Sequence, residues 1–330
     1  MGNPRRMVGA SRCLAPTVRR ITRTGNSRLA PTLATMHEMA SAACGGAMSV
    51  FYINGEFVDA AAASVSATDL AILRGYGVFD FLRTYGGVPF HLGAHLRRLK
   101  RSAALIELKC PWDIEELGEI ILETVKRNAY PESNIRIVVT GGEGEGGFLP
   151  RGDSRLLVMV TPWDAPPAWW HKDGAHVVTT EAQRHLPEAK TINYIPGITA
   201  QLAASKRDPR AIEAIYVADG FVSEGTRSNI FIFKEDHWIT PAEGLLLGVT
   251  RAEVIKLLEA AGLLEMRDIG LDEFRAADEM VLTSSTKEVV PAVRVDDVTI
   301  GEGAPGVMTR CLMRQWRAMT AAYASAGKVL

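Results

Sequence analysis

Cysteine is scarce in this sequence, with four residues among 330, at positions 13, 44, 110 and 311. They are too few and too scattered for a disulfide framework, and no two have the C-x-x-C spacing of a zinc site. Long apolar runs are also missing, because no stretch reaches the roughly 18 residues that a membrane-spanning helix needs. These absences exclude disulfide-stabilised, zinc-binding and membrane-spanning proteins. They favour a soluble intracellular protein of enzyme size.

The charge is nearly balanced, with 37 basic and 38 acidic residues, so composition does not indicate a nucleic-acid partner. The first 48 residues differ, because they contain seven arginines, no lysine and a single acid, Glu38. An arginine-rich, acid-poor start is typical of a transit peptide for the mitochondrion or plastid. Alternatively, translation begins at Met48 and the protein is cytoplasmic. In either case we expect residues 1–48 to be a leader outside the fold.

Turn signals and hydrophobic periodicity divide the remaining chain. Asn54-Gly55 predicts a hairpin over 51–58, and Gly86-Gly87 predicts a second one. Apolar residues at steps of three and four predict a helix from 92 to 106. Strands and helices mix without a regular βαβ rhythm, which favours α+β domains. We expect a small domain at 49–161, a proline-rich linker at 162–170 and a large domain at 171–330.

Several familiar motifs fail on their context. The glycines of 142–147 match G-x-G-x-x-G, but Pro150 and a predicted strand follow where a dinucleotide site needs a helix. We interpret this segment as a hairpin loop. His91 and His95 are four residues apart, yet no third ligand accompanies them, so no metal site is predicted. The sequence has neither a Walker A loop nor a G-x-S-x-G elbow.

Two segments contain side chains with catalytic potential. Lys190 lies in the weakly charged stretch Ala-Lys-Thr-Ile-Asn-Tyr, where burial would lower its pKa and allow it to form a Schiff base. Glu224 lies among small residues in Glu-Gly-Thr-Arg-Ser-Asn, where a carboxylate could hold a proton on a pyridine nitrogen. A solvated surface lysine and an exposed turn acid are the alternative interpretations of the two residues taken singly.

Two further segments could bind phosphate. Thr250 and Glu253 have the spacing of a capping box before a helix at 251–261, and a helix start with free N–H groups binds anions. Arg98 is one turn from His95 at the border of the predicted buried stripe, where a bidentate arginine could hold a phosphate. Ordinary helix capping and a solvated arginine are the corresponding alternatives.

Taken together, these segments resemble the fold-type IV, or class IV, pyridoxal-phosphate-dependent aminotransferases. The resemblance consists of H-x-x-R-L, K-x-x-N-Y, E-G-x-x-S-N, L-x-G-V-T-R and T-S-S-T-x-E-x-x-P in this order, and it covers about 51–320. It implies a small N-terminal domain, a larger domain with a barrel-like sheet, and pyridoxal 5'-phosphate as cofactor. Members of the family include branched-chain and D-amino acid aminotransferases and aminodeoxychorismate lyase.

The resemblance also implies residue roles. Lys190 matches the Schiff-base lysine and proton carrier, and Glu224 matches the partner of the pyridine nitrogen. The other residues expected at the cofactor are Arg98, Val249, Thr250 and Ser285 at the phosphate, Leu246 on the ring face, and Tyr194 at the phenolic oxygen.

The expected substrate pocket is a hybrid of two branches. Tyr194 follows Lys190 by four residues, as in the D-amino acid and lyase branch, whereas the segment that starts at Tyr76 is similar to the branched-chain pattern. Alternation along that strand places Phe79, Phe81 and Arg83 on one face. The predicted substrate residues are therefore Tyr76, Phe79, Arg83, Arg136 and Thr286, with the two arginines as candidate carboxylate partners.

The sequence thus predicts an aminotransferase that exchanges an amino group between a branched-chain or other apolar amino acid and a 2-oxo acid such as 2-oxoglutarate. The alternatives are a D-amino acid aminotransferase, aminodeoxychorismate lyase and a binding protein that keeps only the fold. The family's homodimers suggest that the 141–150 loop closes a partner's site. Neither nucleic acid nor membrane is an expected partner.

Overall fold

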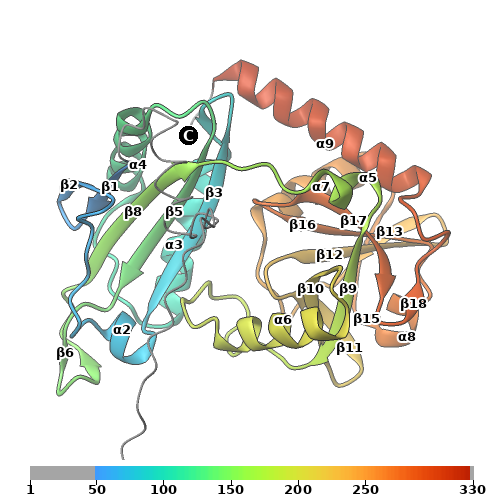
Figure 1. The fold of residues 1–330 in the computed structure, drawn as a ribbon, viewed down its shortest axis with the longest axis horizontal. Coiled ribbons are helices and arrows are strands. Elements are labelled where there is room, and N and C mark those ends of the chain that lie inside the picture. The colour runs from blue at the N-terminus through green and yellow to red at the C-terminus, as the bar shows by residue number, and fades with distance from the viewer. Residues whose placement is uncertain (1–48, 328–330) are drawn as a thin grey trace, which may run out of the picture. The chain divides into compact units, whose positions relative to one another are not determined.

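The computed structural model describes residues 49–327, which lie in one compact unit. The predicted leader, 1–48, lies outside the described residues. The fold is mixed α+β, as predicted, and it contains two large sheets that differ in strand number and curvature (Figure 1). Among the described residues, no helix combines the length and the apolar character that crossing a membrane requires.

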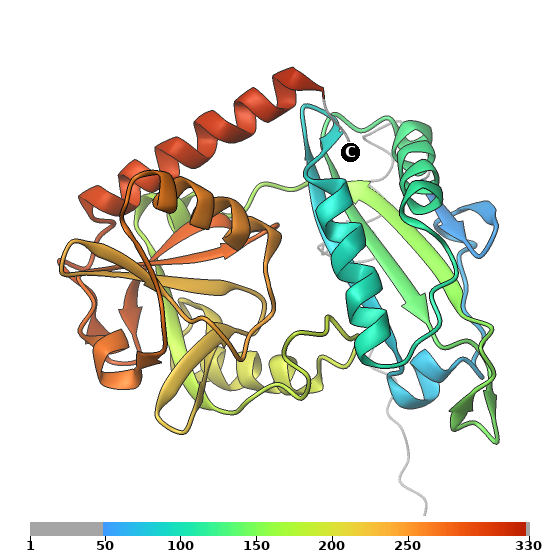
Figure 2. The same cartoon turned by 180° about the vertical axis from the view of Figure 1, so that it is seen from behind.

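The first sheet has six antiparallel strands in the order β2-β1-β8-β5-β3-β4. The helices α3 and α4 pack against it, and Figure 2 shows α3 crossing its face. This half of the chain comprises β1 (Val50–Ile53), β2 (Glu56–Asp59), α2 (Leu70–Arg74), β3 (Gly77–Tyr85), β4 (Val88–Pro89), α3 (Leu92–Leu105), α4 (Ile114–Asn128), β5 (Ser133–Thr140), β6 (Gly144–Glu145), β7 (Leu149–Pro150) and β8 (Arg155–Pro162).

Local chemistry explains most of this half. Asn54 and Gly55 both have positive φ, at 46° and 108°, which a two-residue hairpin turn requires. The predicted helix of 92–106 forms as α3, and Leu92, Leu96 and Leu99 on its inner face are fully buried against the sheet. The segment 142–147 contains β6 and part of the turn of the small hairpin β6–β7, and no helix follows it directly.

The second sheet has ten strands and curls around its own core. Its order is β14-β13-β12-β16-β17-β9-β10-β11-β15, and β18 pairs with β17. This half of the chain comprises α5 (Ala168–Lys172), β9 (Ala175–Glu181), α6 (Ile195–Arg207), β10 (Ala211–Ala218), β11 (Phe221–Gly225), β12 (Asn229–Lys234), β13 (His237–Thr240), α7 (Val249–Ala260), β14 (Leu264–Met266), β15 (Ile269–Gly270), α8 (Leu271–Arg275), β16 (Glu279–Ser284), β17 (Glu288–Val295), β18 (Val298–Thr299) and α9 (Val307–Ala326).

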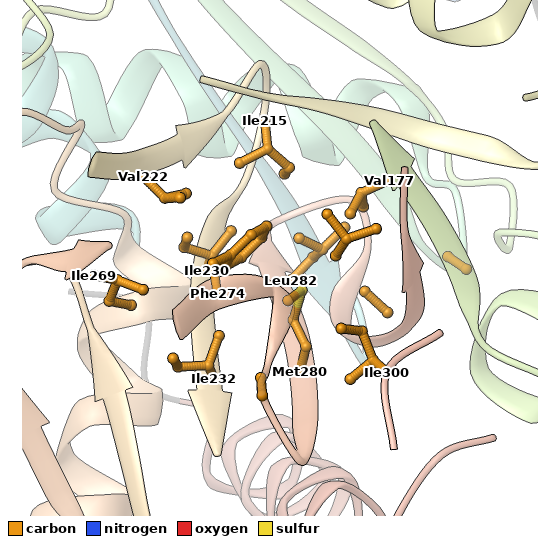
Figure 3. Packing of buried hydrophobic residues seen from close by; sticks show 14 of the residues in the cluster. Val177, Ile215, Val222, Ile230, Ile232, Ile269, Phe274, Met280, Leu282 and Ile300 are labelled. Carbon is orange, nitrogen blue, oxygen red and sulfur yellow. The ribbon is translucent and has the colours of Figure 1, made fainter. Parts of the chain in front are cut away.

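The interior of this curled sheet is apolar. Figure 3 shows Ile215, Ile230, Phe274 and Leu282 converging from different elements on one space. The pairs β9–β10, β9–β17 and β13–β14 are parallel, and the other pairs in the sheet are antiparallel. The result is the half-barrel that the family resemblance implied.

Contacts join the two sheets at several points. The predicted linker, 162–170, runs between the last strand of the first sheet and β9, and α5 begins within it. Helix α9 extends from the second sheet to β3, as Figures 1 and 2 both show. At its far end the Tyr323 hydroxyl donates to the Pro89 carbonyl at 3.1 Å, and it accepts from the His91 N–H at 2.9 Å.

Candidate active site

A cavity of about 470 Å³ contains almost all of the predicted site residues. Segments far apart in the sequence form its wall, from β3, α3 and β5 in the first sheet to the loop before α6, the end of β11, the start of α7 and the turn after β16. The predicted residues that line it are Phe79, Arg98, Arg136, Lys190, Tyr194, Glu224, Leu246, Val249, Thr250, Ser285 and Thr286.

Lys190 is held by its backbone against the first sheet. Its N–H donates to the Ser102 hydroxyl at 3.0 Å, and its carbonyl accepts from the Phe79 N–H at 2.9 Å. The amine Nζ lies 4.6 Å from the centre of the Phe79 ring. Burial, reinforced by the positive charge of Arg98, lowers the pKa of Lys190 to about 7. A substantial fraction of this lysine is therefore a neutral, nucleophilic amine near neutral pH.

Arg98 is fixed by a buried carboxylate. Its Nε and Nη2 donate to the two oxygens of Asp80 at 2.9 and 2.7 Å, and His95 Nδ1 lies 2.7 Å from the same carboxylate. Burial alone would raise the pKa of Asp80, but Arg98 and His95 hold it well below its usual range. Burial lowers the pKa of His95, and the neighbouring Asp80 carboxylate opposes this shift. Arg98 Nη1 also donates to the Leu247 carbonyl at 3.2 Å, close to the start of α7.

Glu224 has a partner that the sequence analysis missed. Arg184 Nε lies 3.1 Å from Glu224 Oε1, and the Leu246 N–H donates to Glu224 Oε2 at 3.0 Å. Arg184 also donates to the Ala189 carbonyl at 3.0 Å, just before Lys190. Burial raises the pKa of Glu224, which Arg184 and the Leu246 amide oppose. Nothing in the local pattern around Arg184 distinguishes it from a solvated arginine, so only the fold shows its position.

The start of α7 provides a site for an anion. Gly248 is the N-cap and offers no side chain to the helix, so the first N–H groups face the cavity without a side-chain cap. The predicted capping box is therefore wrong, because Thr250 lies inside the helix and not at its cap. A Cβ on Gly248 would lie 2.1 Å from Asn229 Oδ1, so a larger residue would displace the Asn229 side chain, which donates to the Leu246 carbonyl. The hydroxyl of Thr283, which also lines the cavity, is buried and has no hydrogen-bond partner within residues 49–327.

The structure does not bring Arg83 into the cavity. Its guanidinium stacks 3.6 Å from the Trp163 ring and 4.2 Å from the Tyr85 ring, and Nη1 pairs with Glu288 at 3.1 Å. The prediction that Arg83 lines the cavity is thus wrong. Alternation along β3 gives the correct face, but the cavity ends before Arg83 and the linker covers the rest of the strand.

Tyr76 is also outside the cavity. Its hydroxyl donates to the Ile106 carbonyl at 3.0 Å, and its side chain borders a smaller cavity of about 250 Å³. Arg184 and Tyr194 line both cavities and separate them.

Arg136 is positioned differently from Arg83. It lies opposite Phe81 on the neighbouring strand, and its guanidinium is 5.4 and 5.1 Å from the Phe79 and Phe81 ring centres. Within residues 49–327 no carboxylate lies within ion-pair distance of it. Burial lowers the pKa of Arg136, although a guanidinium stays charged in proteins. The cavity therefore has an available cation on an apolar wall.

Comparisons with known proteins indicate the family of the chain. The family described as "Amino-transferase class IV" matches residues 77–295. A putative branched-chain-amino-acid aminotransferase of Methanocaldococcus jannaschii is 33% identical over 81% of this chain and 94% of its own length. A D-alanine aminotransferase of Bacillus licheniformis is 33% identical over 78% of this chain and 92% of its own length. The solved structure of the branched-chain amino acid aminotransferase of Thermobaculum terrenum in its PLP form superposes on this fold with a TM-score of 0.75 at 25% identity. The match covers 83% of this chain and 94% of the other.

Proposed function

This chain belongs to the class IV aminotransferases, and from that premise we propose that it moves the amino group of an apolar amino acid, a branched-chain one first, to a 2-oxo acid such as 2-oxoglutarate. The observation that carries the substrate class is Arg136, a cation without a carboxylate partner in the described chain, beside Phe79 and Phe81. The apolar wall suits an aliphatic side chain, and the guanidinium suits the second carboxylate of a dicarboxylic partner.

The cofactor of this enzyme is pyridoxal 5'-phosphate, which when bound withdraws electrons from the substrate Cα. The cavity residues fit it. Glu224 Oε1 is buried and lies in ion-pair contact with Arg184, but within residues 49–327 it accepts no hydrogen bond, so it is available to a ring N–H. The phosphate end would be held by Arg98, by the amides of Val249 and Thr250, and by the hydroxyls of Thr283 and Ser285. Leu246 and Tyr194 would contact the ring.

Proton transfer falls to Lys190 in this proposal. Because the pKa of Lys190 is near 7, Nζ can take a proton from the substrate Cα at neutral pH and would pass it on to a carbon of the bound cofactor. Arg184 opposes the rise that burial causes in the pKa of Glu224, and so favours the carboxylate that would hold a proton on a bound ring nitrogen. Asp80 keeps Arg98 in place while one substrate leaves the cavity and the other enters.

A second candidate is a D-amino acid aminotransferase. Tyr194 follows Lys190 by four residues, the spacing that resembles this branch, and a D-alanine aminotransferase is among the relatives. Tyr194 also contacts Phe79 edge-on, with 5.4 Å between the ring centres, so it lies beside the apolar wall of the cavity.

The proposed assembly is a homodimer of chains with a small domain at 49–161 and a large one at 171–330. Helix α6 presents Ile195, Ile198 and Leu202 at 70, 56 and 58% exposure, spaced along one face. Ile198 also lines the cavity. A second copy that covers this face would protect apolar surface and complete the cavity wall. Light scattering of Ile198→Lys against wild type tests this, and a dimer that is unaffected contradicts it.

The absorbance spectrum of the purified holoenzyme tests the function. We expect the yellow absorbance of the bound cofactor to disappear with L-leucine and with L-glutamate, and to return with 2-oxoglutarate. Bleaching by D-alanine alone would support the second candidate. A yellow protein that ignores all three amino acids would favour aminodeoxychorismate lyase. A protein that takes up no cofactor would favour a binding protein and contradict the proposal.

A further inference from the structure

A buried ion pair lies next to the cavity and has no part in the steps above. Lys287 Nζ is 2.5 Å from Glu213 Oε2, and their side chains are 2 and 0% exposed. Withdrawing two charges from water is costly, and such pairs often add little net stability. The contacts that each residue makes therefore indicate what the pair does.

Glu213, on β10, holds one wall segment of the cavity. It accepts from the hydroxyls of Thr226 at 2.8 Å and Ser228 at 2.9 Å, and from the N–H of Arg227. Together with Lys287 these donors fill the acceptor positions of the carboxylate. A Cβ on Gly225 would lie 2.8 Å from Glu213 Cγ, so the segment 224–229 lies directly on this side chain.

Lys287 holds the turn 284–286, which precedes it. Its N–H donates to the Ser284 hydroxyl at 3.2 Å, and its carbonyl lies 3.1 Å from His171 Nε2. Its Nζ donates to the Ser228 hydroxyl at 3.0 Å, in addition to its pairing with Glu213. One lysine thus connects the turn that carries Ser285 to the segment that carries Glu224.

We propose that Glu213 and Lys287 are positioning residues of the cofactor site, which set the separation between segment 224–229 and turn 284–286. The inference rests on the proposed cofactor contacts of Glu224 and Ser285. It has a second consequence, because the hydroxyl hydrogens of Thr226 and Ser228 are committed to Glu213. The two hydroxyls therefore do not donate into the cavity, and the turn, α7 and Arg98 are the expected donors to an anion there.

The test compares two double variants. Glu213→Gln with Lys287→Met removes both buried charges, and the Gln oxygen can still accept from Thr226 and Arg227. Asp296→Asn with Arg275→Met makes the same changes in a pair that lies outside the cavity, where Arg275 Nη2 is 2.8 Å from Asp296 Oδ2. For each apoprotein, the Kd for pyridoxal phosphate and the denaturant midpoint are measured, and for each holoenzyme kcat and KM.

We expect the first variant to bind pyridoxal phosphate at least about 10-fold more weakly, and its kcat to fall by a larger factor than its KM changes. The control should keep the wild-type Kd. A variant that loses only its denaturant midpoint, with an unchanged Kd, overturns the positioning role. Ser228→Ala leaves both charges in place and is the second measurement if the double variant does not fold. We expect its Kd to rise about threefold, and an unchanged Kd overturns the proposal. Failure of the proposed function is a separate result, in which wild type itself neither binds the cofactor nor transaminates.

Discussion

Arg184 Nε lies 3.1 Å from Glu224 Oε1, in a part of the cavity where the carboxylate is only 6% exposed. The same arginine donates to the carbonyl of Ala189, the residue before Lys190. One side chain therefore connects the charge of the proposed ring partner to the backbone of the proposed catalytic lysine. This relationship makes Arg184 sensitive to substitution in a way that can be measured.

Replacing Arg184 by Met should shift the acid limb of the pH profile upward. Burial already raises the pKa of Glu224, and Arg184 opposes that rise. Without the guanidinium the carboxylate protonates at higher pH, so activity on the acid limb should fall, by about 10-fold for each roughly 1.4 kcal/mol that Arg184 contributes. The pH dependence of kcat for both proteins measures this, with Arg184→Lys expected to lie between them. A variant with an unmoved acid limb contradicts the role of Arg184.

The reaction of the apoenzyme with pyridoxal phosphate should depend on pH with a midpoint near 7. Burial lowers the pKa of Lys190 to about 7, and only the neutral amine is nucleophilic. The rate should therefore rise as pH increases through 7 and level off above about pH 8. Stopped-flow absorbance across pH 6 to 10 records the profile. A midpoint near 10, the value for a solvated lysine, would contradict the burial argument.

Replacing Asp80 by Asn should destabilise the protein and change how its stability depends on pH. Arg98 and His95 hold the pKa of Asp80 below its usual range, so its contribution is present above about pH 4 and is lost as pH falls further. Leaving Arg98 buried without a carboxylate should cost about 3–5 kcal/mol near pH 7. The measurement is urea unfolding of both proteins at several pH values. Equal free energies of unfolding at pH 7 would show that the pair contributes nothing.

Arg136 and Arg83 should respond differently to the same substitution. Arg136→Gln should raise the KM for 2-oxoglutarate by about 10- to 100-fold, the effect of losing charge-assisted hydrogen bonds of roughly 1.5–3 kcal/mol. The KM for leucine should change less, because its side chain carries no charge. Arg83→Gln is the matched control, since Arg83 pairs with Glu288 outside the cavity. It should lower the free energy of unfolding and leave both KM values near wild type. A raised KM for 2-oxoglutarate in Arg83→Gln alone would reverse the assignment.

Local patterns in the sequence were sufficient for much of the fold. The Asn54-Gly55 turn and the leucines of α3 were identified correctly because a two-residue hairpin and an amphipathic helix depend on neighbours within a few positions. The mixed α+β class and the half-barrel followed from the order of these elements and from the family resemblance. The capping box at Thr250 was wrong because its spacing is short and common, and Gly248 occupies the cap.

By itself, the sequence determined the set of chemical groups, namely Lys190, Glu224, Arg98 and the start of α7, and their order along the chain. Only the tertiary structure decided which side chains meet. Arg83 and Arg136 are indistinguishable from local pattern, yet one is stacked on Trp163 and the other is available in the cavity. Arg184, Glu213 and Lys287 carry no local signal. The physical reason is that burial and charge pairing depend on distances between segments up to hundreds of residues apart, which the packing of two sheets and the linker sets.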